Sequence, residues 1–222
     1  MNFLLIIFNF LFICVMLIFC TYLDLKSRKI PNSLFKYLFI ICVILNFIEF
    51  AFCFEDFIGF VVLKFLFLFF IFSLSFLLFV LHIIGGADGK LFLLIFFLHP
   101  VKFLTFYFIT SFLLLFSLLI LLIFMINYVN NINFRNHDSF EIIFNTNFNS
   151  SRFKRSFMRT FYKFLNISEL DYYNEDKHCV KSLNLIYNYT RKKIQILVQY
   201  RPPLIFICFI SYFTVLYIWI YF

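Results

Sequence analysis

Residues 2–23 read NFLLIIFNFLFICVMLIFCTYL and contain no charged side chain. An uncharged apolar run of about 20 residues is long enough to cross a bilayer as an α-helix. The whole chain has the same character, since 64% of its 222 residues are hydrophobic and 41 are Phe. We therefore expect an all-α membrane protein. We also expect this first run to be a retained transmembrane helix, because it has neither the basic start nor the small-residue cleavage site of a secretory signal.

Five more apolar runs follow, so the sequence predicts about six transmembrane helices. The runs cover approximately residues 3–23, 37–54, 57–83, 84–98, 103–127 and 203–222. The fourth is the weakest, because its apolar part, 91–98, gives only about 12 Å of helix at 1.5 Å per residue. This run is long enough to cross the membrane only if its helix begins near Gly85 and the bilayer there is locally thinned or filled with water. We divide the chain into a membrane core (1–127), a polar segment (128–201) and a last transmembrane helix (202–222).

The distribution of the basic residues predicts how these helices are oriented across the membrane. With six spans, the loop after residue 23, the loop around Asp88 and the segment 128–201 share one face, which carries nearly all of the 19 Lys and Arg residues. The positive-inside tendency makes that face cytoplasmic, so we expect a multi-pass protein of the plasma membrane. The net charge of +8 then indicates the lipid bilayer as a partner and no nucleic acid. On the opposite side we expect Glu49 to face the outer headgroups, and Lys64 either to snorkel toward them or to lie at the outer edge of the third span.

Two polar motifs interrupt the apolar sequence on the basic face. They are Asp24-Leu25-Lys26-Ser27-Arg28-Lys29-Ile30-Pro31-Asn32 and Gly85-Gly86-Ala87-Asp88-Gly89-Lys90. An ionised carboxylate beside the membrane core is costly, which favours a functional role for Asp24 and Asp88. Since two spans separate them, both return to the same face, where two carboxylates can share one proton. For each motif alone a structural reading stays open: a headgroup-binding loop for the first and a flexible loop for the second.

Together, the patterns D-x-K-x-R-x-I-P-N and G-G-A-D-x-K resemble those of the type IV prepilin peptidases, which are GxGD aspartyl proteases of the membrane. Ala87 stands where bacterial members have glycine, and the G-G-A-D form is similar to the archaeal branch that processes prepilins and preflagellins. The resemblance covers about residues 1–127. It implies Asp24 and Asp88 as catalytic residues, with no metal or organic cofactor. The supporting motif residues are Gly85, Gly86, Ala87, Lys90, Lys26, Arg28, Pro31 and Asn32.

The resemblance further implies an aspartic endopeptidase that removes a short basic leader from pilin or archaellin precursors at the cytoplasmic face. The lysines and arginines of the two motifs would repel such a leader. An acidic cluster in the polar segment could hold it instead, or could be a solvated face; its members are Glu169, Asp171, Glu175 and Asp176. Residues 152–165 predict either an amphipathic helix on anionic headgroups or a partly ordered loop.

Two other functions remain open from the sequence. A small proton- or cation-coupled transporter would use the same two aspartates as ion sites, and an anchoring protein would use neither. The six cysteines are scattered without a C-x-x-C pair, so we expect no disulfide framework and no metal site.

Overall fold

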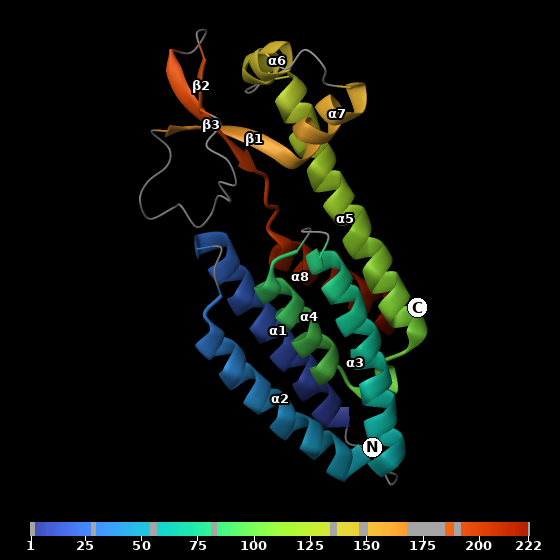
Figure 1. Cartoon of the computed structure of the whole chain (residues 1–222). Helices are drawn as coiled ribbons and strands as arrows, with labels where there is room; N and C mark the ends of the chain where they lie inside the picture. Colours follow the sequence, from blue (N-terminus) through green and yellow to red (C-terminus); the bar gives the residue numbers. More distant parts are fainter. Residues whose placement is uncertain are drawn as a thin grey trace. The chain divides into compact units, whose positions relative to one another are not determined.

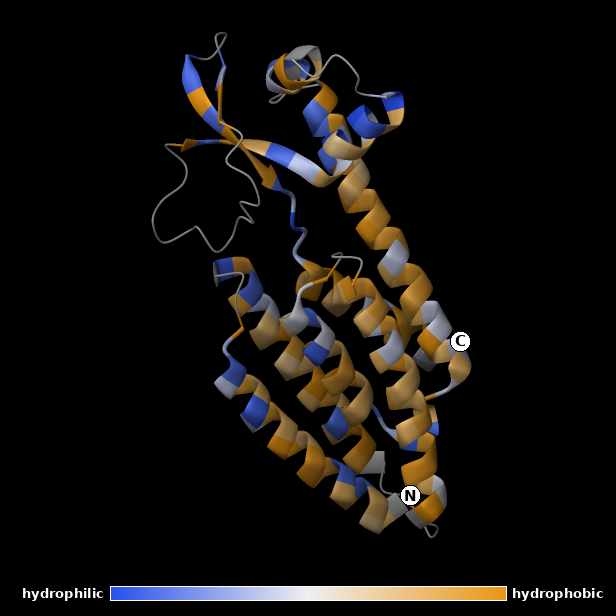
Figure 2. Cartoon of the chain, viewed as in Figure 1, coloured by the Kyte–Doolittle hydropathy of each residue, from blue (hydrophilic) through white to orange (hydrophobic). Residues whose placement is uncertain are grey.

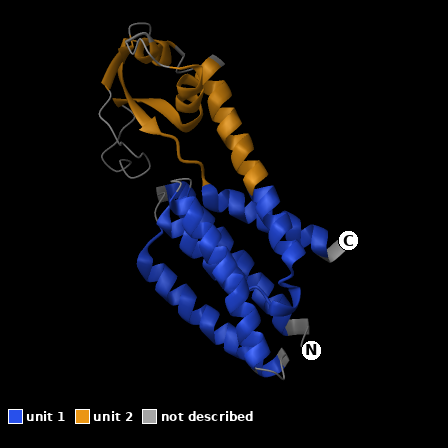
Figure 3. Cartoon of the chain, turned by 45° about the vertical axis from the view of Figure 1, so that its right-hand side comes forward, with its two compact units in different colours: residues 1–116, 204–222 blue, residues 117–203 orange. Residues whose placement is uncertain are grey.

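The computed structural model describes residues 3–27, 30–53, 57–80, 84–133, 137–146, 151–167, 185–188 and 192–221. The chain forms two compact units, coloured separately in Figure 3. Unit 1 contains residues 1–116 and 204–222, and unit 2 contains residues 117–203. The boundary at 116 falls inside a continuous helix. The assignment of the catalytic core to residues 1–127 stays a prediction.

Unit 1 is a bundle of helices that run alternately up and down (Figure 1). Short connections join the first five helices, so successive helices among them run in opposite directions (Figure 1). Helix α4 packs against α1, α2 and α3, and α8 packs against α1. The elements are α1 (Phe3–Ser27), α2 (Asn32–Cys53), α3 (Phe57–Val80), α4 (Gly86–Leu98), the 3₁₀ turn η1 (Val101–Phe103), the first part of α5 (Phe106–Asn133) and α8 (Leu204–Tyr221).

The bundle has the composition of a membrane protein. Among the described residues, four helices are long and apolar enough to cross a bilayer: Leu5–Lys26, Asn32–Phe52, Ile58–Val80 and Phe106–Ile132. Figure 2 shows hydrophobic residues along most of their length. The apolar stretch of α8, Leu204–Trp219, is shorter. Helix α4 has 13 residues, about 20 Å at 1.5 Å per residue against a hydrocarbon core of about 30 Å. A membrane protein with several apolar helices is therefore confirmed, while the number six stays a prediction.

The first two helices extend beyond the predicted apolar runs. Helix α1 continues to Ser27, so Asp24 and Lys26 are helical rather than part of a loop. Helix α2 begins at Asn32 and includes Lys36. A hydropathy pattern ends at the first charge, whereas a helix ends where its hydrogen bonds stop. Pro31 lacks the backbone N–H that a continuing helix needs and is tolerated at a helix start.

Unit 2 contains a sheet, which corrects the all-α expectation. The C-terminal part of α5 is followed by α6 (His137–Thr146), α7 (Arg152–Phe161), β1 (Tyr162–Asn166), β2 (Leu185–Asn188) and β3 (Lys193–Gln199). The strands are antiparallel in the order β1-β3-β2. The sheet was missed because its strands are too short to register as membrane runs. The β-branched residues of β3, Ile194, Ile196 and Val198, favour extended backbone.

Helices α6 and α7 and the sheet share a small aromatic and aliphatic core. Its buried members are Phe140, Ile143, Phe144, Phe164 and Leu197. Of the two alternatives for residues 152–165, a helix is present over 152–161 and is followed by β1 from Tyr162.

Two asparagines of α5 hold the point where α7 meets β1. The Asn131 side-chain amide donates to the carbonyls of Arg159 (2.6 Å) and Tyr162 (2.7 Å). The Asn127 amide donates to the carbonyl of Thr160 at 2.8 Å. These contacts satisfy carbonyls that have no partner at the end of a helix. They give a structural role to part of the asparagine-rich stretch after residue 126.

Candidate functional site

Asp24 is a buried carboxylate in the C-terminal part of α1. Its exposed fraction is 7%. Over the two preceding turns the same helix buries the apolar side chains of Met16, Leu17 and Cys20. Placing an ionisable group in such surroundings is unfavourable unless the structure compensates for it or uses it. Its burial therefore makes Asp24 a candidate functional group.

Asp88 occupies the first turn of α4 and is partly exposed. Its Oδ2 atom accepts a hydrogen bond of 2.9 Å from the backbone N–H of Gly85, the residue that caps the helix. A carboxylate three residues into a helix commonly reaches back in this way, and the positive end of the helix dipole attracts its charge. The contact fixes the direction of the carboxylate at the start of α4.

Gly85 provides the room that this geometry needs. A Cβ atom at Gly85 would lie 3.1 Å from Asp88 Oδ2, closer than most real Cβ contacts. At Gly86 the nearest atom would be Phe79 Cε2 at 3.8 Å, an ordinary contact. A side chain at Gly85 would therefore crowd the Asp88 carboxylate, whereas one at Gly86 would not. Ala87 lies in the helix, where a Cβ atom is accommodated.

The two aspartates lie at the same end of unit 1. Helices α1 and α4 pack against each other, and the last turn of α1 and the first turn of α4 lie toward the same end of unit 1 (Figure 1). Helix α8 also packs against α1, and its Cys208 is buried. Cys20 precedes Asp24 by one helical turn, so these two buried residues share one face of α1.

Lys90 connects the two sequence motifs directly. Its Nζ atom donates to Asn32 Oδ1 at 3.2 Å, and the ammonium group lies 5.9 Å from the centre of the Phe35 ring. The last residue of the second motif thus contacts the last residue of the first. Pro31, immediately before Asn32, is exposed, and its carbonyl accepts from the Leu34 N–H in the first turn of α2.

Other predicted site residues are not brought into this arrangement by the described contacts. Lys26 is exposed, and its ammonium group lies 5.7 Å from the centre of the Tyr22 ring. Arg28 lies outside the described residues, as does the whole acidic cluster: Glu169, Asp171, Glu175 and Asp176. Within the described ranges, no group of three or more His, Cys, Asp or Glu side chains is arranged to hold a metal ion.

Residues 11–130 match the family model of the type IV leader peptidase family. The match covers more than half of the chain and includes both aspartate motifs. The chain belongs to the type IV leader peptidase family. This membership implies prepilin-type peptidase activity and prepilin-like substrates. Comparison with curated proteins and with solved structures gives no match. The family expected from the motifs is thus confirmed, while the archaeal branch stays a prediction.

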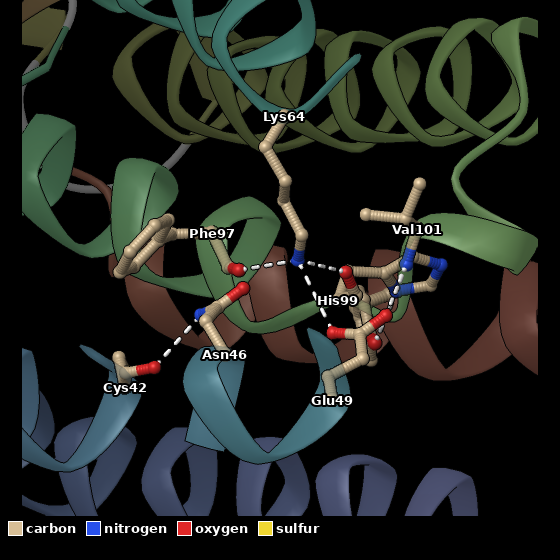
Figure 4. A network of polar contacts seen from close by, with 8 residues as sticks. Cys42, Asn46, Glu49, Lys64, Phe97, His99 and Val101 are labelled. Carbon is tan, nitrogen blue, oxygen red and sulfur yellow. Dashed lines mark hydrogen bonds and ion pairs between the residues drawn. The ribbon is translucent and has the colours of Figure 1, made fainter. Parts of the chain in front are cut away.

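A second polar cluster surrounds the other end of α4 (Figure 4). Lys64 Nζ lies 3.5 Å from Glu49 Oε2 and donates to the carbonyls of Phe97 (2.7 Å) and His99 (2.8 Å). Glu49 Oε1 accepts from the Val101 N–H at 2.7 Å. The exposed fractions are 3% for Glu49 and 4% for Lys64.

This cluster corrects two expectations. Glu49 does not face the outer headgroups, and Lys64 does not snorkel toward them. The reason is the short helix α4, whose last carbonyls need donors. Lys64 supplies them with the positive charge that a helix C-terminus favours, and Glu49 offsets that charge. The sequence signal for this ion pair is a Glu and a Lys in adjacent apolar runs. Hydropathy alone does not show that the two side chains meet.

A buried histidine extends the polar contacts at this end of α4. His99 is fully buried, and its Nδ1 atom lies 2.9 Å from the hydroxyl of Tyr212 on α8. The His99 ring also packs against Phe108 of α5, with ring centres 4.4 Å apart. These contacts fix the turn between α4 and η1 against two further helices.

Proposed function

We propose that the protein is an aspartic endopeptidase that removes the short basic leader of type IV prepilin-like precursors. Family membership supplies the reaction class. The observation that supports the aspartic mechanism is the placement of Asp24 and Asp88 on two packed helices, at the end where α1 finishes and α4 starts. The contact between Lys90 and Asn32 supports a single site, because it ties the two motifs together.

The proposed mechanism uses one proton shared between the two carboxyl groups. Two neighbouring carboxylates do not readily ionise together, so the pair titrates as a unit. The ionised member takes a proton from water as the water oxygen attacks the scissile carbonyl carbon. The protonated member donates a hydrogen bond to the carbonyl oxygen. The carbon–nitrogen bond then breaks as a proton passes to the leaving amine. Either aspartate can serve as the base in this scheme.

The proposed substrate has a basic leader followed by a hydrophobic helix and is cut between the two at the cytoplasmic face. Ala87 favours archaeal-type substrates, either prepilins or preflagellins. We further propose that the acidic cluster holds the leader, since the lysines of the two motifs carry the same charge as the leader. Reversing the charge of its four members, Glu169, Asp171, Glu175 and Asp176, should raise the concentration of substrate needed for cleavage.

Co-expression with epitope-tagged precursors tests the proposed activity. A prepilin and a preflagellin should each be examined, with a variant whose basic leader residues are replaced by Gln as the specificity control. We expect a smaller product whose N-terminus, read by mass spectrometry, begins at the junction of leader and helix. Precursors that stay full length beside a stably produced protein would contradict the proposal.

A further inference from the structure

A wide apolar groove in unit 1 is lined by neither of the two proposed catalytic aspartates. It lies on α2, α3 and α4 and has a volume of about 920 Å³. This is near the upper end of the range of about 300–1,000 Å³ that is typical of small-molecule sites. Its walls are mainly aromatic, with Phe39 from α2, Phe65 and Phe69 from α3, and Phe97 from α4.

The polar lining of the groove is cationic. Asn32 and Lys36 are one turn apart on α2 and therefore on one face of that helix, and Lys90 joins them from α4. The ammonium group of Lys90 has three N–H donors, of which the contact with Asn32 Oδ1 uses one. The Asn32 amide nitrogen and the Lys36 ammonium group add further donors. None of the described residues that line the groove is acidic.

We propose that this groove binds one phospholipid with an anionic headgroup. The phosphate accepts hydrogen bonds from Lys36, Lys90 and Asn32, and the acyl chains lie along the phenylalanine side chains. Basic pockets between transmembrane helices on the cytoplasmic side are the sites that anionic headgroups occupy. The hydrophobic helix of a substrate fits the same apolar walls, but its basic leader would meet two lysines. Charge complementarity therefore selects the lipid, and the inference does not depend on peptidase activity.

Tryptophan fluorescence in vesicles tests this site in the full chain. The protein has one Trp, so Trp219→Phe gives a silent background. Phe69→Trp then reports from the groove at the middle of α3, and Val15→Trp reports from an exposed position at the middle of α1. Each reporter is measured in vesicles with the same mole fraction of brominated phosphatidylglycerol or brominated phosphatidylcholine. We expect the groove reporter to prefer the anionic lipid by a factor on the order of ten, and the α1 reporter to show no preference.

Two lysine variants decide whether the preference belongs to the groove. Lys36→Gln should remove most of it, and raising the salt concentration should weaken it. Lys102→Gln, at an exposed lysine of η1, is the matched control and should leave it unchanged. Equal quenching of the Phe69→Trp reporter by both lipids would overturn the proposal. A preference that survives Lys36→Gln, or quenching relieved by an added precursor helix, would overturn it as well.

Discussion

The two ends of α4 both carry ionisable side chains, but only one end leaves space beside them. At the start of the helix, Asp88 is partly exposed and is preceded by the small residues Gly85 and Gly86. At the other end, Lys64 and Glu49 are almost fully buried and bond to each other and to backbone groups. Burial of charge therefore does not identify an active site by itself. Asp24 is nearly as buried as Glu49 and Lys64, so the difference lies at Asp88, whose partial exposure gives access that the sealed Glu49–Lys64 pair does not have.

The largest expected effect separates these two roles. Asp24→Asn and Asp88→Asn should each lower the rate of leader removal by a factor of about 100 to 10,000, the usual contribution of general acid–base catalysis. Neither variant should change the thermal unfolding profile greatly, because asparagine keeps the shape of the side chain. Leader removal is measured in vesicles with enzyme in excess over precursor. Loss of folding together with activity would place the aspartates with the sealed cluster instead.

At the C-terminal end of α4, with its sealed Glu49–Lys64 pair, a substitution should lower stability rather than act on catalysis. Lys64→Met leaves the buried Glu49 without its cation and removes donors from two carbonyls, so unfolding should become easier by about 3–5 kcal/mol. The double variant Lys64→Met/Glu49→Gln should recover part of this loss, since no isolated charge remains. Denaturant titration in mixed micelles gives the values, with Lys102→Met as the control at an exposed lysine. An unchanged midpoint for Lys64→Met would mean that the cluster does not stabilise α4.

The two glycines before Asp88 provide a finer test of the open end. Gly85→Ala pushes against the carboxylate and should slow cleavage by about tenfold, because small displacements of a catalytic group are costly. Gly86→Ala meets only an ordinary contact with Phe79, and alanine suits a helix better than glycine, so its rate should stay within about twofold. Equal losses in both variants would show that general flexibility matters rather than the space at Gly85.

The smallest effect concerns a sealed contact in unit 2. Asn131→Ala removes two hydrogen bonds to carbonyls at the junction of α7 and β1, each worth about 1 kcal/mol. Amide hydrogen exchange at this junction should therefore become faster. Asn130→Ala, at the neighbouring exposed position, should have no effect. Cleavage should be nearly unaffected by Asn131→Ala, since the proposed catalytic pair lies in unit 1. Unchanged exchange in Asn131→Ala would contradict the structural role of this side chain.

The parts of the structure that sequence could predict are those that depend on local pattern. Apolar runs indicated the long helices of unit 1, and the two motifs indicated the family. Counting spans predicts that Asp24 and Asp88 return to one face of the membrane, which stays a prediction; in the structure α1 ends and α4 begins at the same end of unit 1 (Figure 1). Each of these inferences uses residues close together in the chain or a simple alternation of helix direction.

The parts that could not be predicted depend on contacts between distant residues. The pairing of Glu49 with Lys64 requires α2, α3 and the end of α4 to meet, and hydropathy reports none of these approaches. The sheet of unit 2 requires β1 to find β3 across about thirty residues of sequence. The difference between Gly85 and Gly86 depends on where the Asp88 carboxylate turns, which composition cannot specify.

A comparison of the double variant Asp24→Asn/Asp88→Asn with the two single variants tests the proposed pairing most directly. Residues that act as one unit give losses that do not multiply. If the two carboxylates share one proton in one reaction, the double variant should cleave the precursor at the residual rate of the single variants, within about threefold. A double variant whose loss is the product of the two single losses would contradict the pairing. The aspartates would then act independently.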